Sequence, residues 1–280
     1  GDHGVAQHGV SAYPSEVSLQ MAANIQAGGA AINVLGRAAG ASVRVVDVSL
    51  DHDVWGDERV SRSCGSIDRE DAMDDDQVIR SLQIGQRVAD QEVDSGVDLL
   101  IAGDLGIGNT TPAAALIGAM TSTEPVVVVG RGTGIDDEGW KRKVTAVRDA
   151  MYRVRAIKHD PIAVLKAISS PDLAAMAGFL AQAAVRRTPV LLDGVVVTSA
   201  ALMANKLAPG ARKWWVAGHK GAEPAHILAL NSLHLDPLLD FGMRLGEGSG
   251  AAAALPLVKA ATDIMIDMAT FESAGVSEKD

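Results

Sequence analysis

The chain has 280 residues, of which 48% are hydrophobic, 21% charged and only 3% aromatic. This composition excludes disorder over most of the chain and predicts a core of small and aliphatic side chains. The net charge of −10 argues against nucleic acid as a partner, because a polyanion would be repelled. The single cysteine, Cys64, excludes an internal disulfide. We find no secretory signal and no apolar run that would span a membrane, so we expect a cytoplasmic protein.

Strands and helices alternate along the predicted chain. Short apolar runs predict strands at residues 43–48, 99–102, 126–129, 190–192 and 214–217. Between and beyond them we expect helices at residues 15–27, 77–92, 111–120, 136–154, 171–186, 198–207, 223–232 and 250–271. Residues 61–76 are polar and irregular and predict an exposed loop. The alternation indicates an α/β fold, Rossmann-like, with a mostly parallel sheet and helices on both faces.

A glycine-rich string, Gly-Asp-Leu-Gly-Ile-Gly-Asn-Thr-Thr at residues 103–111, follows one predicted strand and opens a helix. Glycines let the backbone approach an anion, and a helix N-terminus offers unpaired N–H groups. The candidate ligand-binding residues here are Gly106, Gly108, Asn109, Thr110 and Thr111. The same string would also suit a tight turn with a helix cap and no ligand.

A second glycine-rich string predicts a phosphate site after the expected strand at residues 126–129. Its candidate residues are Arg131, Gly132, Thr133 and Gly134. It matches neither the P-loop nor the dinucleotide-binding fingerprint. Lys143 follows on the next helix and could cover the anion, although a solvated basic face would have the same pattern.

A third string, Arg-Leu-Gly-Glu-Gly-Ser-Gly at residues 244–250, places Glu247 among glycines ahead of the last long helix. Such a carboxylate is a good candidate for a general base, and the alternative is an acid at a helix dipole. Asp193 after a strand could face a ligand or turn the chain. His219 and Glu223 lack a third ligand at metal-site spacing, and His3 lies in a flexible-looking N-terminal turn, so we expect no metal and no cofactor.

Seven strings together resemble, in the same order, the nicotinate-nucleotide–dimethylbenzimidazole phosphoribosyltransferase family of the cobalamin lower-ligand pathway. The resemblance spans nearly the whole chain and comprises residues 2–5, 28–33, 106–111, 131–134, 192–194, 222–226 and 245–250. It implies transfer of the phosphoribosyl group of nicotinate mononucleotide to 5,6-dimethylbenzimidazole, with inversion at the ribose C1. The products would be α-ribazole 5′-phosphate and nicotinate, without metal or pyrophosphate.

The resemblance also implies roles for individual residues. Glu247 matches the catalytic glutamate, and Asp104 matches an active-site acid that is commonly the longer Glu in relatives. Lys143, Gly248 and Gly250 join the two glycine-rich turns as phosphate- and ribose-binding candidates. Candidates for the benzimidazole pocket are Tyr13, Gln20, Leu105 and Leu245.

The resemblance divides the chain into three parts. We expect residues 1–40 to form the helical part of a smaller domain that lacks an N-terminal segment here. Residues 41–249 would form the phosphoribosyl-binding domain, and residues 250–280 a helix packing back on the smaller domain. Relatives form homodimers, which we also expect here. Two alternatives remain open: the same donor with another base as acceptor, and a nucleotide-binding module without turnover.

Overall fold

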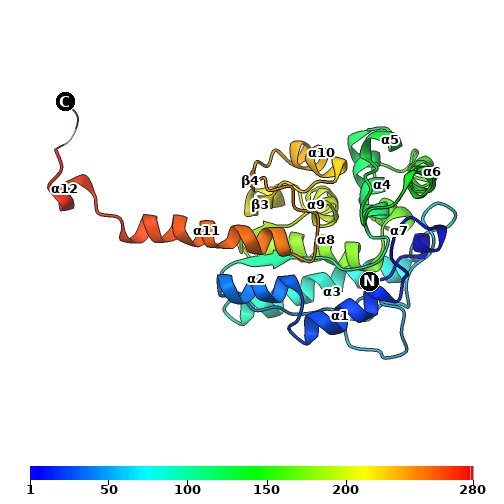
Figure 1. The fold of residues 1–280 in the computed structure, drawn as a ribbon, viewed down its shortest axis with the longest axis horizontal. Helices are drawn as coiled ribbons and strands as arrows, with labels where there is room; N and C mark the ends of the chain where they lie inside the picture. The colour runs from blue at the N-terminus through cyan, green and yellow to red at the C-terminus, as the bar shows by residue number, and fades with distance from the viewer. Residues whose placement is uncertain (278, 280) are drawn as a thin grey trace.

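The computed structural model describes residues 1–277 and 279 and contains a four-stranded, fully parallel sheet (Figure 1). Its strands, in spatial and chain order, are β1 (Leu100–Ala102), β2 (Val190–Leu192), β3 (Trp215–His219) and β4 (Pro237–Leu239). The register aligns Ala102 with Leu192 and Leu192 with Ala217. The residues that follow β1 and β2 therefore emerge at one edge of the sheet, where parallel α/β folds bind ligands.

Side chains alternate between two covered faces of the sheet, as a strand buried on both sides requires. Leu100, Leu192 and Trp215 join the main core, which the helices at residues 110–121, 171–185, 195–207 and 224–233 cover. Ile101 and Leu191 face the other way and pack against the helices at residues 31–39 and 249–267. The predicted α/β architecture, with helices on both faces of a parallel sheet, is confirmed.

The helices predicted from the sequence are all present, with ends shifted by up to a few residues. They are α1 (Val17–Gln26), α3 (Asp75–Asp94), α4 (Thr110–Thr121), α6 (Asp137–Arg153), α8 (Pro171–Val185), α9 (Val195–Leu207), α10 (Pro224–Leu233) and α11 (Ser249–Asp267). The structure adds elements that the sequence reading missed: η1 (Gly4–His8), α2 (Ala31–Ala39), α5 (Pro125–Val128), α7 (Pro161–Ile168), η2 (Ala211–Trp214), α12 (Phe271–Ala274) and β4. The sequence did contain a signal for α7, because Asp followed by Pro is typical of a helix start. In the structure the Asp160 side chain caps α7 ahead of Pro161.

Two predicted strands are wrong. Residues 126–129 lie mostly in α5, a single helical turn that begins at Pro125 and leaves Val126 and Val127 exposed. A short apolar run cannot by itself separate strand from helix, and proline at the first helical position favoured the helix. Residues 43–48 are irregular: Val46 and Val48 pack with helices α3 and α8, whereas Val45 packs in a different cluster with Ile32 of α2.

The predicted exposed loop at residues 61–76 is irregular but substantially buried. Ile67 is 1% exposed and Met73 2%, and both lie in the main core. Arg153 of α6 donates hydrogen bonds to the backbone oxygens of Ile67 and Ala167. The segment therefore packs between helices. Its many acidic residues had predicted solvent exposure instead.

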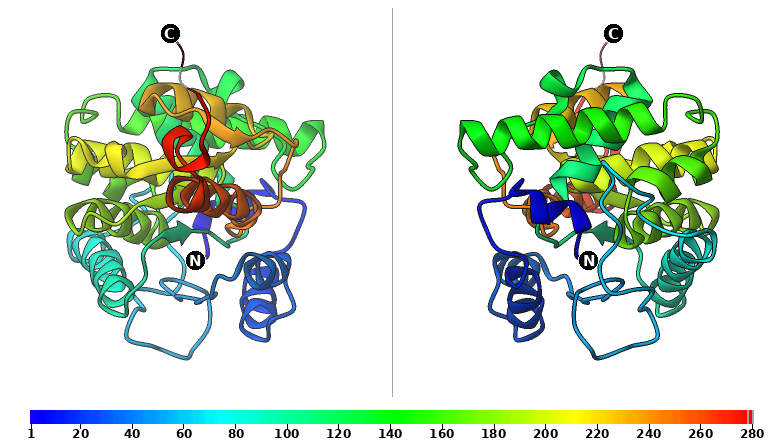
Figure 2. Two further views of the ribbon diagram at one scale, coloured as in Figure 1. Left: turned by 90° about the vertical axis from the view of Figure 1, so that its left-hand side faces the viewer. Right: turned by 90° about the vertical axis from the view of Figure 1, so that its right-hand side faces the viewer.

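Helix α11 begins inside the protein and then projects away from it, with α12 beyond (Figure 1). Ala251, Ala254 and Leu255 are in the core, and Lys259 Nζ donates to the backbone oxygen of Ala39 at the end of α2. By length and hydropathy α11 could cross a membrane, but a third of it is buried within the protein. Figure 2 shows α2 and α3 on opposite sides of the body. The proposed division into three parts stays a prediction.

Candidate active site

The three glycine-rich segments meet at the edge of the sheet. The backbone N–H of Glu247 donates to the carbonyl oxygen of Asp104 at 3.3 Å, which joins the first string to the third. Arg244 Nη2 donates to the carbonyl oxygen of Gly132 at 3.0 Å, which joins the third to the second. Strings far apart in sequence therefore form one surface.

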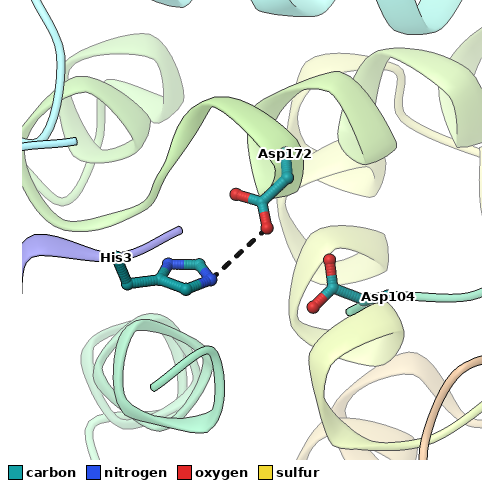
Figure 3. Close-up of side chains that lie close together, drawn as sticks. All are labelled: His3, Asp104 and Asp172. Carbon is teal, nitrogen blue, oxygen red and sulfur yellow. Dashed lines mark ion pairs between the residues drawn. The ribbon is translucent and has the colours of Figure 1, made fainter. Parts of the chain in front are cut away.

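Asp104 directly follows Gly103 at the end of β1 and lies in a group of charged side chains (Figure 3). Its carboxylate accepts a hydrogen bond of 2.7 Å from Asn109 Nδ2. Nearby, His3 Nε2 lies 3.4 Å from Asp172 Oδ2, in an ion pair between two buried side chains. Asp172 opens α8, and His3 comes from the start of the chain, so three separate segments supply this group.

Burial and mutual charge shift the pKa values of this group. Burial raises the pKa of Asp104, the Asp172 carboxylate raises it further, and it reaches about 6. Burial would lower the pKa of His3, but Asp172 and, to a smaller extent, Cys64 together outweigh burial and raise it to about 10. At neutral pH, His3 is therefore a cation paired with Asp172, and Asp104 is mostly ionised.

The same three side chains are the candidate ligands for a cation. Ligand atoms of His3, Asp104 and Asp172 all lie within 4.8 Å of one another. A metal would need the neutral imidazole, whereas the pKa of His3, about 10, favours its protonated form at neutral pH. The arrangement therefore fits an ion pair beside the Asp104 carboxyl group better than a metal centre.

Glu247 lies in a backbone conformation that most residues avoid. Its φ is +63°, between Gly246 at +86° and Gly248 at +84°. The side chain is partly buried; burial raises its pKa, and the charge of Asp193 raises it further. A raised pKa makes a carboxylate a stronger base, which suits proton abstraction.

A buried lysine, Lys143, lies next to Gly132 of the second string and Thr110 of the first. Lys143 of α6 is fully buried, and its Nζ donates to Thr110 Oγ1 at 2.7 Å. A Cβ at Gly132 would lie 3.2 Å from this Nζ, so glycine leaves space at the ammonium group. Burial lowers the pKa of Lys143 to about 8, against the opposing charge of Glu223. Glu223 Oε1 also accepts from the Gly132 N–H at 2.8 Å, so this donor already has a partner.

The other residues of these strings have diverse surroundings. Arg131 pairs with Asp137, and Thr133 Oγ1 accepts from the Ala12 N–H at 2.9 Å. Gly134 has a φ of +100° and open space where a Cβ would be. A Cβ at Gly106 would collide with the Gly1 carbonyl oxygen, so this glycine admits the N-terminal segment of the chain itself. The Thr111 side chain is buried, with a hydroxyl that has no partner among the described residues.

The candidates for the benzimidazole pocket are spread over the surface. Tyr13 and Leu245 are more than half exposed, and Gln20 is exposed on α1. Leu105 is partly buried and packs in a cluster with Ile32 of α2. The α1 residue that does reach the Asp104 turn is Ser18, whose hydroxyl accepts from the Ile107 N–H at 3.0 Å.

Several buried polar residues at this edge are not predicted as site residues by the sequence. His3, expected in a flexible turn, is only 3% exposed. Asp172 and Asp193 are also buried, and Glu223 binds the second string. A polar residue directly after an apolar strand was a usable signal for Asp193, whereas Asp172 gave none because it resembles an ordinary helix-start acid.

Cavities occur beside this edge and elsewhere. One of about 200 Å³ is lined by His3 together with Asp2, Gly4, Gln7, Ser15, Asp51 and Ser63. A larger, open one of about 480 Å³ lies between residues 65–77 and Lys166 and includes no candidate site residue. The convergence of charged groups, and not cavity size, therefore locates the site.

Comparison with known proteins places this chain in a family. A family model described as phosphoribosyltransferase (DBI_PRT) matches residues 1–276. The chain is 73% identical over 276 residues to nicotinate-nucleotide–dimethylbenzimidazole phosphoribosyltransferase of Corynebacterium glutamicum strain R, covering 99% of the chain and 77% of that relative. It is 59% identical to the enzyme of that name from Mycobacterium tuberculosis, covering 100% of the chain and 78% of the relative.

A solved structure agrees in fold. The crystal structure of CobT from Thermus thermophilus superposes with a TM-score of 0.95 at 42% identity, covering 99% of this chain and 84% of that one. The chain therefore belongs to the nicotinate-nucleotide–dimethylbenzimidazole phosphoribosyltransferase family.

Proposed function

We propose that this chain transfers the phosphoribosyl group of nicotinate mononucleotide to 5,6-dimethylbenzimidazole, as the names of its relatives state for them. The single observation that supports this most is the contact between the backbones of Asp104 and Glu247, which Arg244 links to the Gly132 turn next to the buried ammonium group of Lys143. The proposed reaction needs a cation for the donor phosphate, an acid near the sugar carbon and a base for the incoming benzimidazole, and Lys143, Asp104 and Glu247 would supply these.

Glu247 is the proposed general base. It takes the N–H proton of the benzimidazole, whose nitrogen attacks the ribose C1 from the α face. The bond to nicotinate breaks, and its electron pair neutralises the pyridinium nitrogen, so the configuration at C1 inverts. Positive charge that develops on the ribose is stabilised by Asp104, whose pKa of about 6 leaves it ionised at neutral pH.

The donor phosphate is proposed to bind near Lys143 and Thr110. The ammonium group is buried, so its charge is little screened, and Gly132 leaves space beside it. The hydrogen bond from Gly132 to Glu223 keeps one amide occupied. We therefore assign phosphate recognition chiefly to Lys143 and the remaining donors of the two turns.

The test is incubation of the protein with nicotinate mononucleotide and 5,6-dimethylbenzimidazole, with nicotinate and α-ribazole 5′-phosphate separated by chromatography. Both products should appear in equal amounts and only when both substrates are present. Turnover with another benzimidazole or a purine alone would support the alternative acceptor. Donor binding without release of nicotinate would support a binding module and overturn the proposal.

The assembly proposed for the chain is a homodimer in the cytoplasm. The outer half of α11 exposes Met265 and Ile266, and Met268 and Phe271 beyond it are exposed too. A second copy of the chain would bury this apolar surface. Sedimentation equilibrium should give twice the monomer mass. The variant Ile266→Asp, which places a charge on this apolar surface, should shift the equilibrium toward monomer. Monomer at all concentrations would exclude the dimer.

A further inference from the structure

We infer that Asp193 is a positioning residue for the reaction, because its buried carboxylate holds residues 248–251 and so fixes Glu247 at the sheet edge. This inference rests on the proposed role of Glu247 as base. The residue itself is not expected to touch either substrate.

Among the described residues, the hydrogen bonds that the Asp193 carboxylate accepts come from residues 248–251, next to Glu247. Asp193 directly follows β2 and is 2% exposed. Its Oδ2 accepts from the Gly248 N–H at 3.0 Å, and its Oδ1 accepts from the N–H groups of Gly250 at 2.8 Å and Ala251 at 3.1 Å. One carboxylate thus satisfies the unpaired donors at the start of α11, where a negative charge is also favoured by the helix dipole.

The loop needs such an anchor because of its backbone conformation. Glu247 has a left-handed φ, which costs free energy for any residue with a Cβ and persists only where the surroundings enforce it. On one side, its own N–H is bound to Asp104. On the other side, the next N–H, of Gly248, is bound to Asp193. Glu247 is therefore held between the ends of β1 and β2.

His219 supports Asp193 from β3. Its Nε2 lies 3.2 Å from Asp193 Oδ1, at ion-pair distance, although it is not aligned for a hydrogen bond. The ring also fills the space beside Gly250, where a Cβ would collide with His219 Cδ2. The first turn of α11 therefore packs directly on this imidazole.

Asp193 also acts on Glu247 through its charge. Burial would raise the pKa of Asp193, but His219 and the bound N–H groups outweigh burial and lower it, so the carboxylate is ionised. The titratable and charged groups around the loop are Asp104 after β1, Asp193 after β2, His219 on β3 and Arg244 on the loop, with His226 of α10 behind His219 at a ring distance of 5.8 Å. Among them, Asp193 raises the pKa of Glu247 in addition to burial.

The test is Asp193→Asn, which keeps the shape but removes the charge and one acceptor. Displacement of a base by about 1 Å can lower a rate by about 100-fold, so we expect kcat to fall by about 10- to 100-fold with little change in KM for the donor. The acid limb of the pH profile of kcat should move to lower pH, because Glu247 loses a neighbouring negative charge. A purely structural role would lower kcat and leave the limb in place. Asp149→Asn, at a half-exposed acid of α6 paired with Arg148, is the control and should change neither.

The double variant Asp193→Asn with Glu247→Gln separates the possible outcomes. If Asp193 acts through Glu247, the double variant should be no slower than Glu247→Gln alone. Wild-type kcat and pH profile in Asp193→Asn, or a multiplied loss in the double variant, would overturn the inference. Full turnover in Glu247→Gln would instead overturn the proposed role of Glu247 as base, whereas the absence of turnover in the wild-type protein would overturn the proposed function.

A second variant covers the case in which Asp193→Asn does not fold. Gly250→Ala would push the first turn of α11 away from His219 and from the Asp193 oxygens. It should lower kcat and add nothing to the loss in Glu247→Gln. Unchanged turnover in Gly250→Ala would equally overturn the inference.

Discussion

The backbone N–H of Glu247 donates to the carbonyl oxygen of Asp104, so the proposed base and the proposed charge-stabilising acid are joined through their main chains. Gly103 makes this approach possible. A Cβ there would lie 2.7 Å from the Glu247 carbonyl carbon and oxygen and from the Gly248 nitrogen. The spacing of the two carboxylates therefore depends on backbone packing, which a single methyl group would disturb.

Gly103→Ala should consequently lower both activity and stability. The added methyl group meets backbone atoms of residues 247 and 248, and overpacking of this kind costs about 1–3 kcal/mol in the free energy of unfolding. Steady-state kinetics and denaturant titration would measure the two effects. Gly56→Ala is the matched control, because a Cβ at Gly56 meets nothing within 4 Å. Equal behaviour of the two variants would show that the contact at Gly103 tolerates the change.

Glu247→Gln should leave the fold and donor binding intact and lower kcat by about 10²–10⁴-fold, the usual contribution of a general base. Glutamine has nearly the same size but cannot accept the benzimidazole proton. Calorimetric titration with nicotinate mononucleotide would check binding, and nicotinate release would check turnover. Near-normal turnover would remove Glu247 from the mechanism.

The sequence predicted the parts of the site that are local. Apolar runs followed by glycine and small polar residues at 103–111 and 244–250 placed Asp104 and Glu247 at strand or helix ends, and their order suggested the family. What it did not predict is pairing between distant segments. The ion pair of His3 with Asp172 joins the start of the chain to α8, and nothing local to either residue indicates the other.

The errors in the predicted secondary structure have a similar origin. Residues 126–129 are apolar enough for a strand, but their environment leaves two of the valines exposed, and local proline chemistry sets a helical turn. Strand β4 lies at the edge of the sheet and is only partly buried, so its apolar signal was weak. Burial, which depends on the whole fold, decided each case.

Asp104→Asn should stabilise the protein at neutral pH while it lowers activity. The pKa of Asp104 is raised from 3.8 to about 6, so its ionisation destabilises the fold as the pH rises through this range. Asparagine removes that charge and can still accept from Asn109. The melting temperature should rise at pH 7.5 and change less at pH 4, where Asp104 is already largely protonated. A lower melting temperature at pH 7.5 would contradict the prediction.

Lys143→Met should weaken the binding of nicotinate mononucleotide. It should also abolish the loss of affinity that we expect for the wild-type protein at alkaline pH. A hydrogen bond to a charged group contributes about 1.5–3 kcal/mol, so the dissociation constant should rise by about 10- to 100-fold. The pKa of Lys143 is lowered to about 8, so the wild-type protein should bind the donor more weakly as the pH rises from 7 to 9, while the variant should not change. Lys141→Met is the control on the same helix, since Lys141 is exposed and paired with Glu138 at 2.7 Å. Calorimetric titration at several pH values measures all three proteins, and equal affinities of the two variants would exclude Lys143 from phosphate binding.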